Sequence, residues 1–177
     1  MKPCVTLYTG GARSGKSRLA LEHALRYPRR AFIATAMAFD DEMRQRIAAH
    51  QTERGGQFVT LEEPLDLAGA LRRVPPATDV VLIDCLTVWL GNLMHHQGDD
   101  LRWHPQIDEL LAVLDRPPAA ILLVTNEVGM GLVPESAMGR RFRDIQGATN
   151  QKVAALADTV VFVACGQPLA LKGSLPR

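Results

Sequence analysis

The feature that most constrains this chain is a glycine-rich segment close to its amino terminus. Residues 10–17 read Gly-Gly-Ala-Arg-Ser-Gly-Lys-Ser and match the pattern G-x-x-x-x-G-K-[ST]. In such a loop, glycines let the backbone wrap a phosphate, and N–H groups at a helix N-terminus supply positive potential. The lysine reaches the β- and γ-phosphates, and the serine hydroxyl can bind Mg²⁺. The expected nucleotide contacts are Gly10, Gly11, Ala12, Arg13, Ser14, Gly15, Lys16 and Ser17.

The residues on either side of this phosphate loop (residues 10–17) support the interpretation. A short β-rich run, residues 4–9, precedes it, and a helical pattern begins at Lys16, which gives strand, loop and helix in order. A glycine-rich turn that contains Lys-Ser by coincidence is the alternative. The sequence therefore predicts that the chain binds a nucleoside triphosphate.

Strand and helix patterns alternate along the rest of the chain. This alternation predicts one three-layer α/β domain, residues 1–177, with a mainly parallel sheet flanked by helices. The expected strands are 4–9, 31–35, 58–61, 79–84, 119–125 and 159–164, the last main strand. The expected helices are 17–27, 40–54, 65–73, 86–94, 105–114 and 136–157.

Composition and charge exclude several classes of function. The 177 residues carry a net charge of +1, so electrostatics favours neither nucleic acid nor an anionic membrane as a partner. No apolar run reaches membrane-spanning length. Three scattered cysteines, each in or beside an apolar run, favour buried free thiols in a reducing compartment. We expect a cytoplasmic protein without stable membrane insertion.

Two carboxylates follow apolar strands and are candidates for chemistry. Asp84 ends the run 79–84, where a phosphate-loop protein keeps the carboxylate that holds Mg²⁺, and the carboxyl ends of strands would bring it beside the loop. The alternative is that Asp84 caps the next helix. Glu127 lies just past the next apolar strand and could assist a base or a water, or be a solvated loop carboxylate.

His50 is the candidate nucleophile. It lies in the expected helix 40–54, with Arg46 one turn before it and Arg54 one turn after it. Two nearby cations favour the neutral, nucleophilic imidazole and suit a phosphate site. Attack on the α-phosphorus of a nucleotide would give a phosphoramidate-linked intermediate. A surface histidine or a satisfied core histidine is the alternative.

Several segments, in order from residue 5 to the C-terminus, match one known family. They include Thr9-Gly-Gly-Ala-Arg-Ser-Gly-Lys-Ser-Arg18, Asp84-Cys-Leu-Thr87, Thr125-Asn-Glu-Val-Gly129, Gly139-Arg-Arg-Phe-Arg-Asp144 and Asn150-Gln151. The segments 84–87 and 125–129 are far more specific than the phosphate loop. With these segments the chain resembles the bifunctional adenosylcobinamide kinase / adenosylcobinamide-phosphate guanylyltransferase family of cobalamin (vitamin B12) biosynthesis. The resemblance implies a P-loop NTPase fold of the RecA-like type.

The resemblance also implies two reactions. A nucleoside triphosphate, ATP or GTP, phosphorylates the aminopropanol hydroxyl of adenosylcobinamide with Mg²⁺ held by Ser17 and Asp84. GTP then transfers GMP to adenosylcobinamide phosphate through a guanylylated histidine, which falls on His50. Lys16 and Asp84 would serve the kinase step.

Further implications of the resemblance concern nucleotide contacts and assembly. Nucleotide contacts would include Thr35, Arg54 and Glu62, with the adjacent Glu63 as the alternative to Glu62, and the assembly would be a homotrimer. Two rival functions are a single-function small-molecule kinase and a non-catalytic nucleotide switch.

Overall fold

The computed structural model describes residues 3–37, 52, 55–98 and 103–176 of the chain. Nearly all of the expected helix 40–54 lies outside these residues, and with it Arg46, His50 and Arg54. Their predicted roles therefore stay predictions.

The described residues form a seven-stranded sheet with the order β3-β2-β4-β5-β1-β6-β7. The strands are β1 Val5–Gly10, β2 Arg30–Ala34, β3 Val59–Glu62, β4 Val80–Asp84, β5 Ala120–Val124, β6 Thr159–Ala164 and β7 Gln167–Lys172. Each neighbouring pair is parallel except β6 and β7, which are antiparallel. This topology confirms the predicted α/β fold with a mainly parallel sheet.

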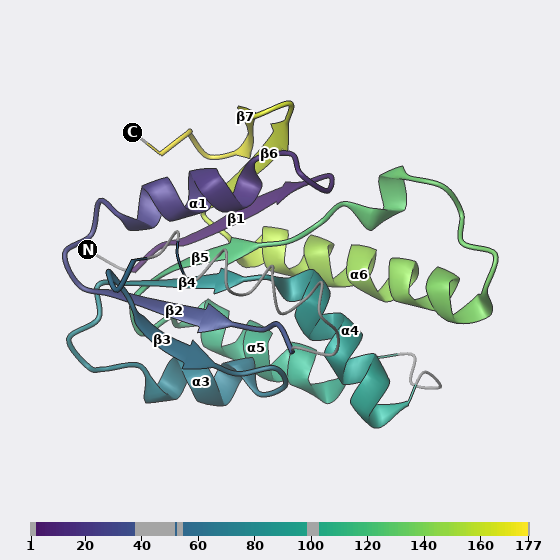
Figure 1. Ribbon diagram of the computed structural model, residues 1–177, viewed down its shortest axis with the longest axis horizontal. Coiled ribbons are helices and arrows are strands. Elements are labelled where there is room, and N and C mark those ends of the chain that lie inside the picture. Colours follow the sequence, from purple (N-terminus) through teal and green to yellow (C-terminus); the bar gives the residue numbers. More distant parts are fainter. Residues whose placement is uncertain (1–2, 38–51, 53–54, 99–102, 177) are drawn as a thin grey trace.

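Helices cover both faces of this sheet (Figure 1). They are α1 Lys16–Ala24, α3 Leu67–Arg73, α4 Leu86–Gln97, α5 Pro105–Asp115 and α6 Ala137–Leu156, with a short 3₁₀ turn, η1, at Val128–Met130. α1 packs on one face, and α3, α4, α5 and α6 contribute to the core on the other face. Within the described residues, no helix combines the length and the apolar character needed to cross a membrane.

Successive side chains of each central strand point to opposite faces of the sheet, which explains the two cores. Val81 and Ile83 of β4 face the core shared with α3–α6, whereas Val80 and Leu82 face the core shared with α1. Because both faces are covered, the strand is apolar throughout, which made β4 recognisable in the sequence. Trp89 of α4 is fully buried, and its Nε1 donates a hydrogen bond to the Leu65 carbonyl at 2.8 Å.

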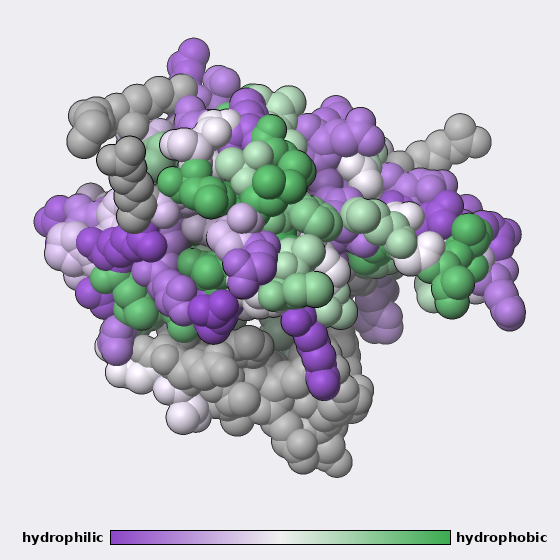
Figure 2. Space-filling view, turned by 90° about the horizontal axis from the view of Figure 1, so that it is seen from above, coloured by the Kyte–Doolittle hydropathy of each residue, from purple (hydrophilic) through white to green (hydrophobic). Residues whose placement is uncertain are grey.

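β7 is the described strand that the sequence analysis missed. The chain reverses after β6 at Cys165 and Gly166, both with positive φ (52° and 76°), and returns antiparallel. β7 is a short edge strand that begins Gln-Pro and leaves Leu169 and Leu171 exposed, so it lacks the long buried apolar run of a central strand. Figure 2 views the molecule from the side of α1 and β7, and hydrophobic and hydrophilic side chains are mixed on this face.

The expectation of a buried thiol was wrong for Cys165, which is exposed in the turn between β6 and β7.

Candidate active site

The phosphate loop joins β1 to α1 and requires glycine at its first position. Gly10 has φ of 152°, and a Cβ added there would lie 2.3 Å from the Val163 carbonyl oxygen on the neighbouring strand β6. Gly15 (φ 96°) and Arg13 (φ 56°) also adopt left-handed conformations. The backbone therefore curls at the carboxyl end of β1 immediately before the N-terminus of α1, as a phosphate-binding loop requires.

Lys16 begins α1 and is buried within the loop. Its ammonium group donates a hydrogen bond to the Gly11 carbonyl at 2.9 Å. Burial lowers the pKa of Lys16, and the neighbouring Cys85 and Asp84 partly offset this effect. An anionic phosphate in the loop would favour the charged ammonium in the same way.

Asp84 ends β4 at the same edge of the sheet. β5 lies between β4 and β1, so Asp84 is not on the strand next to the loop, although its charge reaches Lys16. The N-cap of α4 is Cys85, whose Sγ accepts a hydrogen bond from the Val88 N–H at 3.5 Å. Helix capping therefore does not account for Asp84. Burial, with the Asp84 charge, raises the pKa of the Cys85 thiol to about 12.

Thr35 follows β2 and its side chain is fully buried beside β4. Its hydroxyl donates to the Cys85 carbonyl and accepts from the Cys85 N–H, each at 2.9 Å. Asn92 of α4 donates to the Thr35 carbonyl at 2.7 Å. These bonds hold the backbone that follows Asp84, and the predicted contact of Thr35 with a nucleotide stays a prediction.

Glu62 and Glu63 have different environments at the end of β3. The Glu63 carboxylate accepts hydrogen bonds from the Leu65 and Asp66 N–H groups and pairs with Arg73 at 2.7 Å. Burial would raise the pKa of Glu63, but these partners hold it below its usual value. Glu62 is exposed, which leaves it the better placed of the two for a ligand.

Glu62 and the phosphate loop are far apart along one edge. Four strand spacings separate β3 from β1, which is roughly 19 Å at about 4.8 Å per step. The predicted site residues in the described part thus form two groups. The loop residues lie at the end of β1, with Asp84 two strands away, whereas Thr35 directly follows β2 and Glu62 ends β3.

Sequence reasoning missed the side chains that hold Glu127. Glu127 follows β5, and its Oε1 accepts hydrogen bonds from the Thr9 hydroxyl at 2.7 Å and from the Asn150 amide at 3.0 Å. Thr9 is in β1 and Asn150 is in α6. Both residues lie in segments that carry the family resemblance, and this was the available signal, but only the fold brings them to Glu127.

No cluster suited to a structural metal is present in the described part of the chain, where no three or more His, Cys, Asp or Glu residues gather. Mg²⁺ in a phosphate-loop site does not need such a cluster. It is usually held by one carboxylate, a hydroxyl, water and the substrate phosphates.

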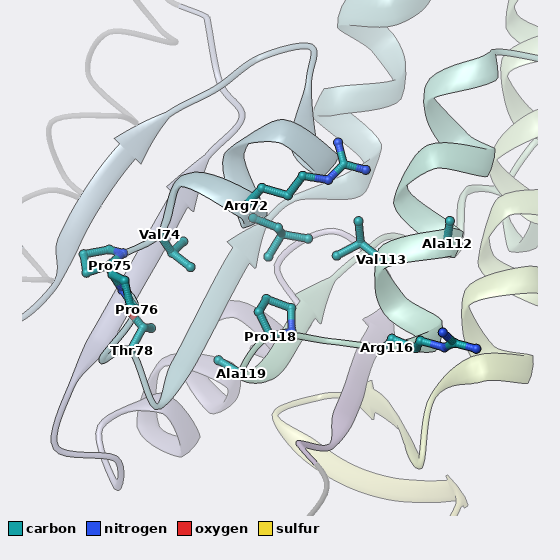
Figure 3. A pocket seen from close by; sticks show the side chains of 11 residues that line it. Arg72, Val74, Pro75, Pro76, Thr78, Ala112, Val113, Arg116, Pro118 and Ala119 are labelled. Carbon is teal, nitrogen blue, oxygen red and sulfur yellow. The ribbon is translucent and has the colours of Figure 1, made fainter.

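A cavity of about 510 Å³ lies at the opposite edge of the sheet (Figure 3). Thr78 and Ala119, which line it, precede β4 and β5, whereas the phosphate loop follows the carboxyl end of β1. Arg72 and Arg116 lie at the ends of α3 and α5. This cavity is therefore separate from the nucleotide site.

Comparison with known proteins agrees with this geometry. The family model described as cobinamide kinase / cobinamide phosphate guanyltransferase matches residues 6–171. The chain belongs to this family. Members of the cobinamide kinase family include the bifunctional adenosylcobalamin biosynthesis protein CobP of Pseudomonas aeruginosa, which is 44% identical over 94% of this chain and 96% of its own length.

Two further relatives of this chain are nearly as similar. The bifunctional adenosylcobalamin biosynthesis proteins CobU of Escherichia coli and of Salmonella typhimurium are each 39% identical over 94% of this chain and 98% of their own length. Among solved structures, an ATPase from a bacterial type III secretion system has a TM-score of 0.53 at 12% identity. The similarity covers 94% of this chain and 56% of that one, and it concerns the fold.

Proposed function

We propose that this chain phosphorylates adenosylcobinamide with a nucleoside triphosphate and then transfers GMP from GTP to the product, giving adenosylcobinamide-GDP for cobalamin synthesis. The observation that carries this function is the family match over residues 6–171, together with a complete phosphate loop at the carboxyl end of β1. ATP and GTP are both proposed as donors in the kinase step.

In the kinase step the loop binds the triphosphate through its N–H groups and the N-terminus of α1. Lys16 neutralises charge on the β- and γ-phosphates, and its ammonium group has two further N–H donors besides the one that binds the Gly11 carbonyl. Since phosphoryl transfer needs positioning and neutralisation more than covalent chemistry, these residues supply much of the catalysis.

Ser17 and Asp84 fit the role of Mg²⁺ ligands. Ser17 lies in the first turn of α1, directly after Lys16, and the Asp84 carboxylate lies near enough to Lys16 to raise its pKa. When bound, Mg²⁺ supplies charge neutralisation between the β- and γ-phosphates. Loss of either side chain is expected to weaken the binding of the Mg²⁺–nucleotide complex.

For the transferase step we propose that His50 attacks the α-phosphorus of GTP. The step forms an N–P bond, breaks the bond to the α–β bridging oxygen and releases pyrophosphate. The phosphate oxygen of adenosylcobinamide phosphate then displaces His50 from that phosphorus. Thr35, Arg54 and Glu62 are proposed contacts of the guanine nucleotide, and we also propose a homotrimer located in the cytoplasm.

Labelling with α-³²P-GTP tests the transferase. The wild-type protein incubated with Mg²⁺ should retain label after denaturing electrophoresis and lose it in acid, because a phosphoramidate bond is acid-labile. His50→Ala should carry no label and lose GMP transfer while keeping most kinase activity. His96→Ala is the matched control, since this histidine is exposed at the end of α4 and should label normally.

Other outcomes would separate the rival functions. A folded protein that phosphorylates adenosylcobinamide without taking up label would be a single-function kinase. A protein that binds GTP but does neither reaction would be a nucleotide switch. Equal loss of both activities in a folded His50→Ala protein would contradict separate roles for the histidine and the loop.

A further inference from the structure

We propose that Glu127 is the general base that takes the proton from the substrate hydroxyl in the kinase step, and that Thr9 and Asn150 position its carboxylate. The inference rests on the proposed function. It concerns the alcohol acceptor rather than the nucleotide.

Glu127 is tied directly to the start of the phosphate loop. Its backbone N–H donates to the Gly10 carbonyl at 3.1 Å. Its Oε1 accepts from the hydroxyl of Thr9, the residue before Gly10, at 2.7 Å. β5, which ends just before Glu127, is the direct neighbour of β1. The carboxylate is therefore fixed to the segment that wraps the phosphates.

The two oxygens of Glu127 have different environments. Oε1 has two donors, the Thr9 hydroxyl and the Asn150 amide. Oε2 has no hydrogen bond to any residue in the described part of the chain, and the side chain is only half-buried. One oxygen is thus used for positioning, which leaves the other available to a substrate hydroxyl.

A second set of hydrogen bonds fixes the orientation of Asn150. Its Oδ1 accepts from Gln146 at 2.9 Å and from the Thr125 hydroxyl at 2.8 Å. With the oxygen engaged by two donors, the amide nitrogen must point to Glu127 and to the Asn126 carbonyl. Gln146 and Thr125 are fully buried, so this support is shielded from water. Such preorganisation is what a positioned base requires.

Other carboxylates of the described part are less suited to this role. Asp84 ends β4, one strand further from the loop than β5, which precedes Glu127, and its charge acts on Lys16. Glu62 lies four strands from β1. Asp158 accepts a hydrogen bond from the Val5 N–H at the opposite end of β1.

The hydroxyl oxygen of adenosylcobinamide forms a bond to the γ-phosphorus, and its proton passes to Oε2 of Glu127. The bond between the γ-phosphorus and the β–γ bridging oxygen breaks, and the nucleoside diphosphate leaves with that electron pair. Glu127 then returns the proton to solvent.

Glu127→Gln is the decisive variant because glutamine keeps an oxygen for Thr9 and Asn150 but cannot accept the proton. Its kinase kcat should fall by about 10²- to 10⁴-fold, the usual contribution of a general base, with the KM for nucleotide little changed. We expect the wild-type kinase rate to fall at acid pH and the rate of Glu127→Gln to lack this fall. GMP transfer from GTP to supplied adenosylcobinamide phosphate should be retained.

Thr9→Val is the matched positioning variant, since it removes one donor and leaves the carboxylate. It should lower kcat by roughly tenfold and keep the acid limb of the pH profile. Thermal melting and nucleotide binding show whether each variant is folded.

Three results would overturn the assignment. Kinase activity of Glu127→Gln within threefold of wild type would exclude a base. A rate restored by excess Mg²⁺ would make Glu127 a metal ligand, and loss of both activities with a lowered melting temperature would make it structural. Failure of the proposed function would appear instead in the wild-type protein, as absence of both activities, and would overturn both proposals.

Discussion

His23 and Tyr8 form a buried pair between α1 and β1. The Tyr8 hydroxyl and Nδ1 of His23 share a hydrogen bond of 2.9 Å, and the rings meet edge to face. Burial, with the Arg26 charge, lowers the pKa of His23 to about 4, and burial raises the pKa of Tyr8. The pair therefore links β1 to α1 through a neutral imidazole.

This pair predicts a pH dependence of stability. The unfolded chain binds a proton on His23 below its ordinary pKa of about 6.5, whereas the folded chain binds it only near pH 4. The free energy of unfolding should therefore fall as pH drops from about 6.5 to 4, by up to about 3 kcal/mol. Urea unfolding across this range measures the effect.

His23→Gln keeps a hydrogen-bonding group for Tyr8 but does not titrate in this pH range. It should therefore lack this pH-dependent fall in the free energy of unfolding. His96→Gln, at an exposed site, should retain it. An unchanged slope in His23→Gln would contradict the assignment of the pH dependence to His23.

At the scale of elements, two acidic residues determine where α3 begins. Asp66 is the N-cap, and its side chain accepts a hydrogen bond from the Gly69 N–H at 2.7 Å. Glu63 accepts from the Leu65 and Asp66 N–H groups just before the helix. The expected helix began at Leu65, two residues early, because the apolar pattern does not show which residue caps it.

Loss of this cap should destabilise the protein measurably. Asp66→Ala removes the acceptor for Gly69 and should lower the free energy of unfolding by about 1 kcal/mol, measured by urea titration. Asp66→Asn keeps an acceptor oxygen and should stay close to wild type. Equal destabilisation by both substitutions would mean that charge, rather than capping, is what matters at this position.

At the scale of the whole molecule, the two edges of the sheet differ. The loop, Asp84, Glu127 and Glu62 lie at or just beyond the carboxyl ends of strands, and the cavity of Figure 3 lies at the amino ends. Ligands of open α/β sheets bind at the carboxyl edge, because loops there are free to vary around fixed strands. The proposed kinase reaction thus belongs to the carboxyl edge of the sheet.

The proposed homotrimer is tested at this scale. Several large apolar side chains are exposed in the segment between β5 and the first turn of α6: Met130, Leu132, Val133 and Met138. Clustered exposure of this kind is typical of surfaces that other chains cover. Light scattering should give a mass about three times 19.4 kDa, and a monomer mass at micromolar concentration would contradict the proposal.

The sequence by itself determined the features that local patterns encode. Glycine spacing specified the phosphate loop, and the apolar runs of β4 and β5 specified buried parallel strands. The whole-length set of segments indicated the family. The phosphate loop and the buried strands could be recognised because glycine conformation and strand burial leave their mark on residues close together in the chain.

Only the tertiary structure decided which distant groups meet. Thr9 and Glu127 are 118 residues apart and become partners because β5 pairs with β1. Thr35 and Cys85 are 50 residues apart and meet because β2 lies beside β4. Strand order depends on how all helices and strands pack together. A hydrophobic pattern within one short segment of the sequence carries no information about that order.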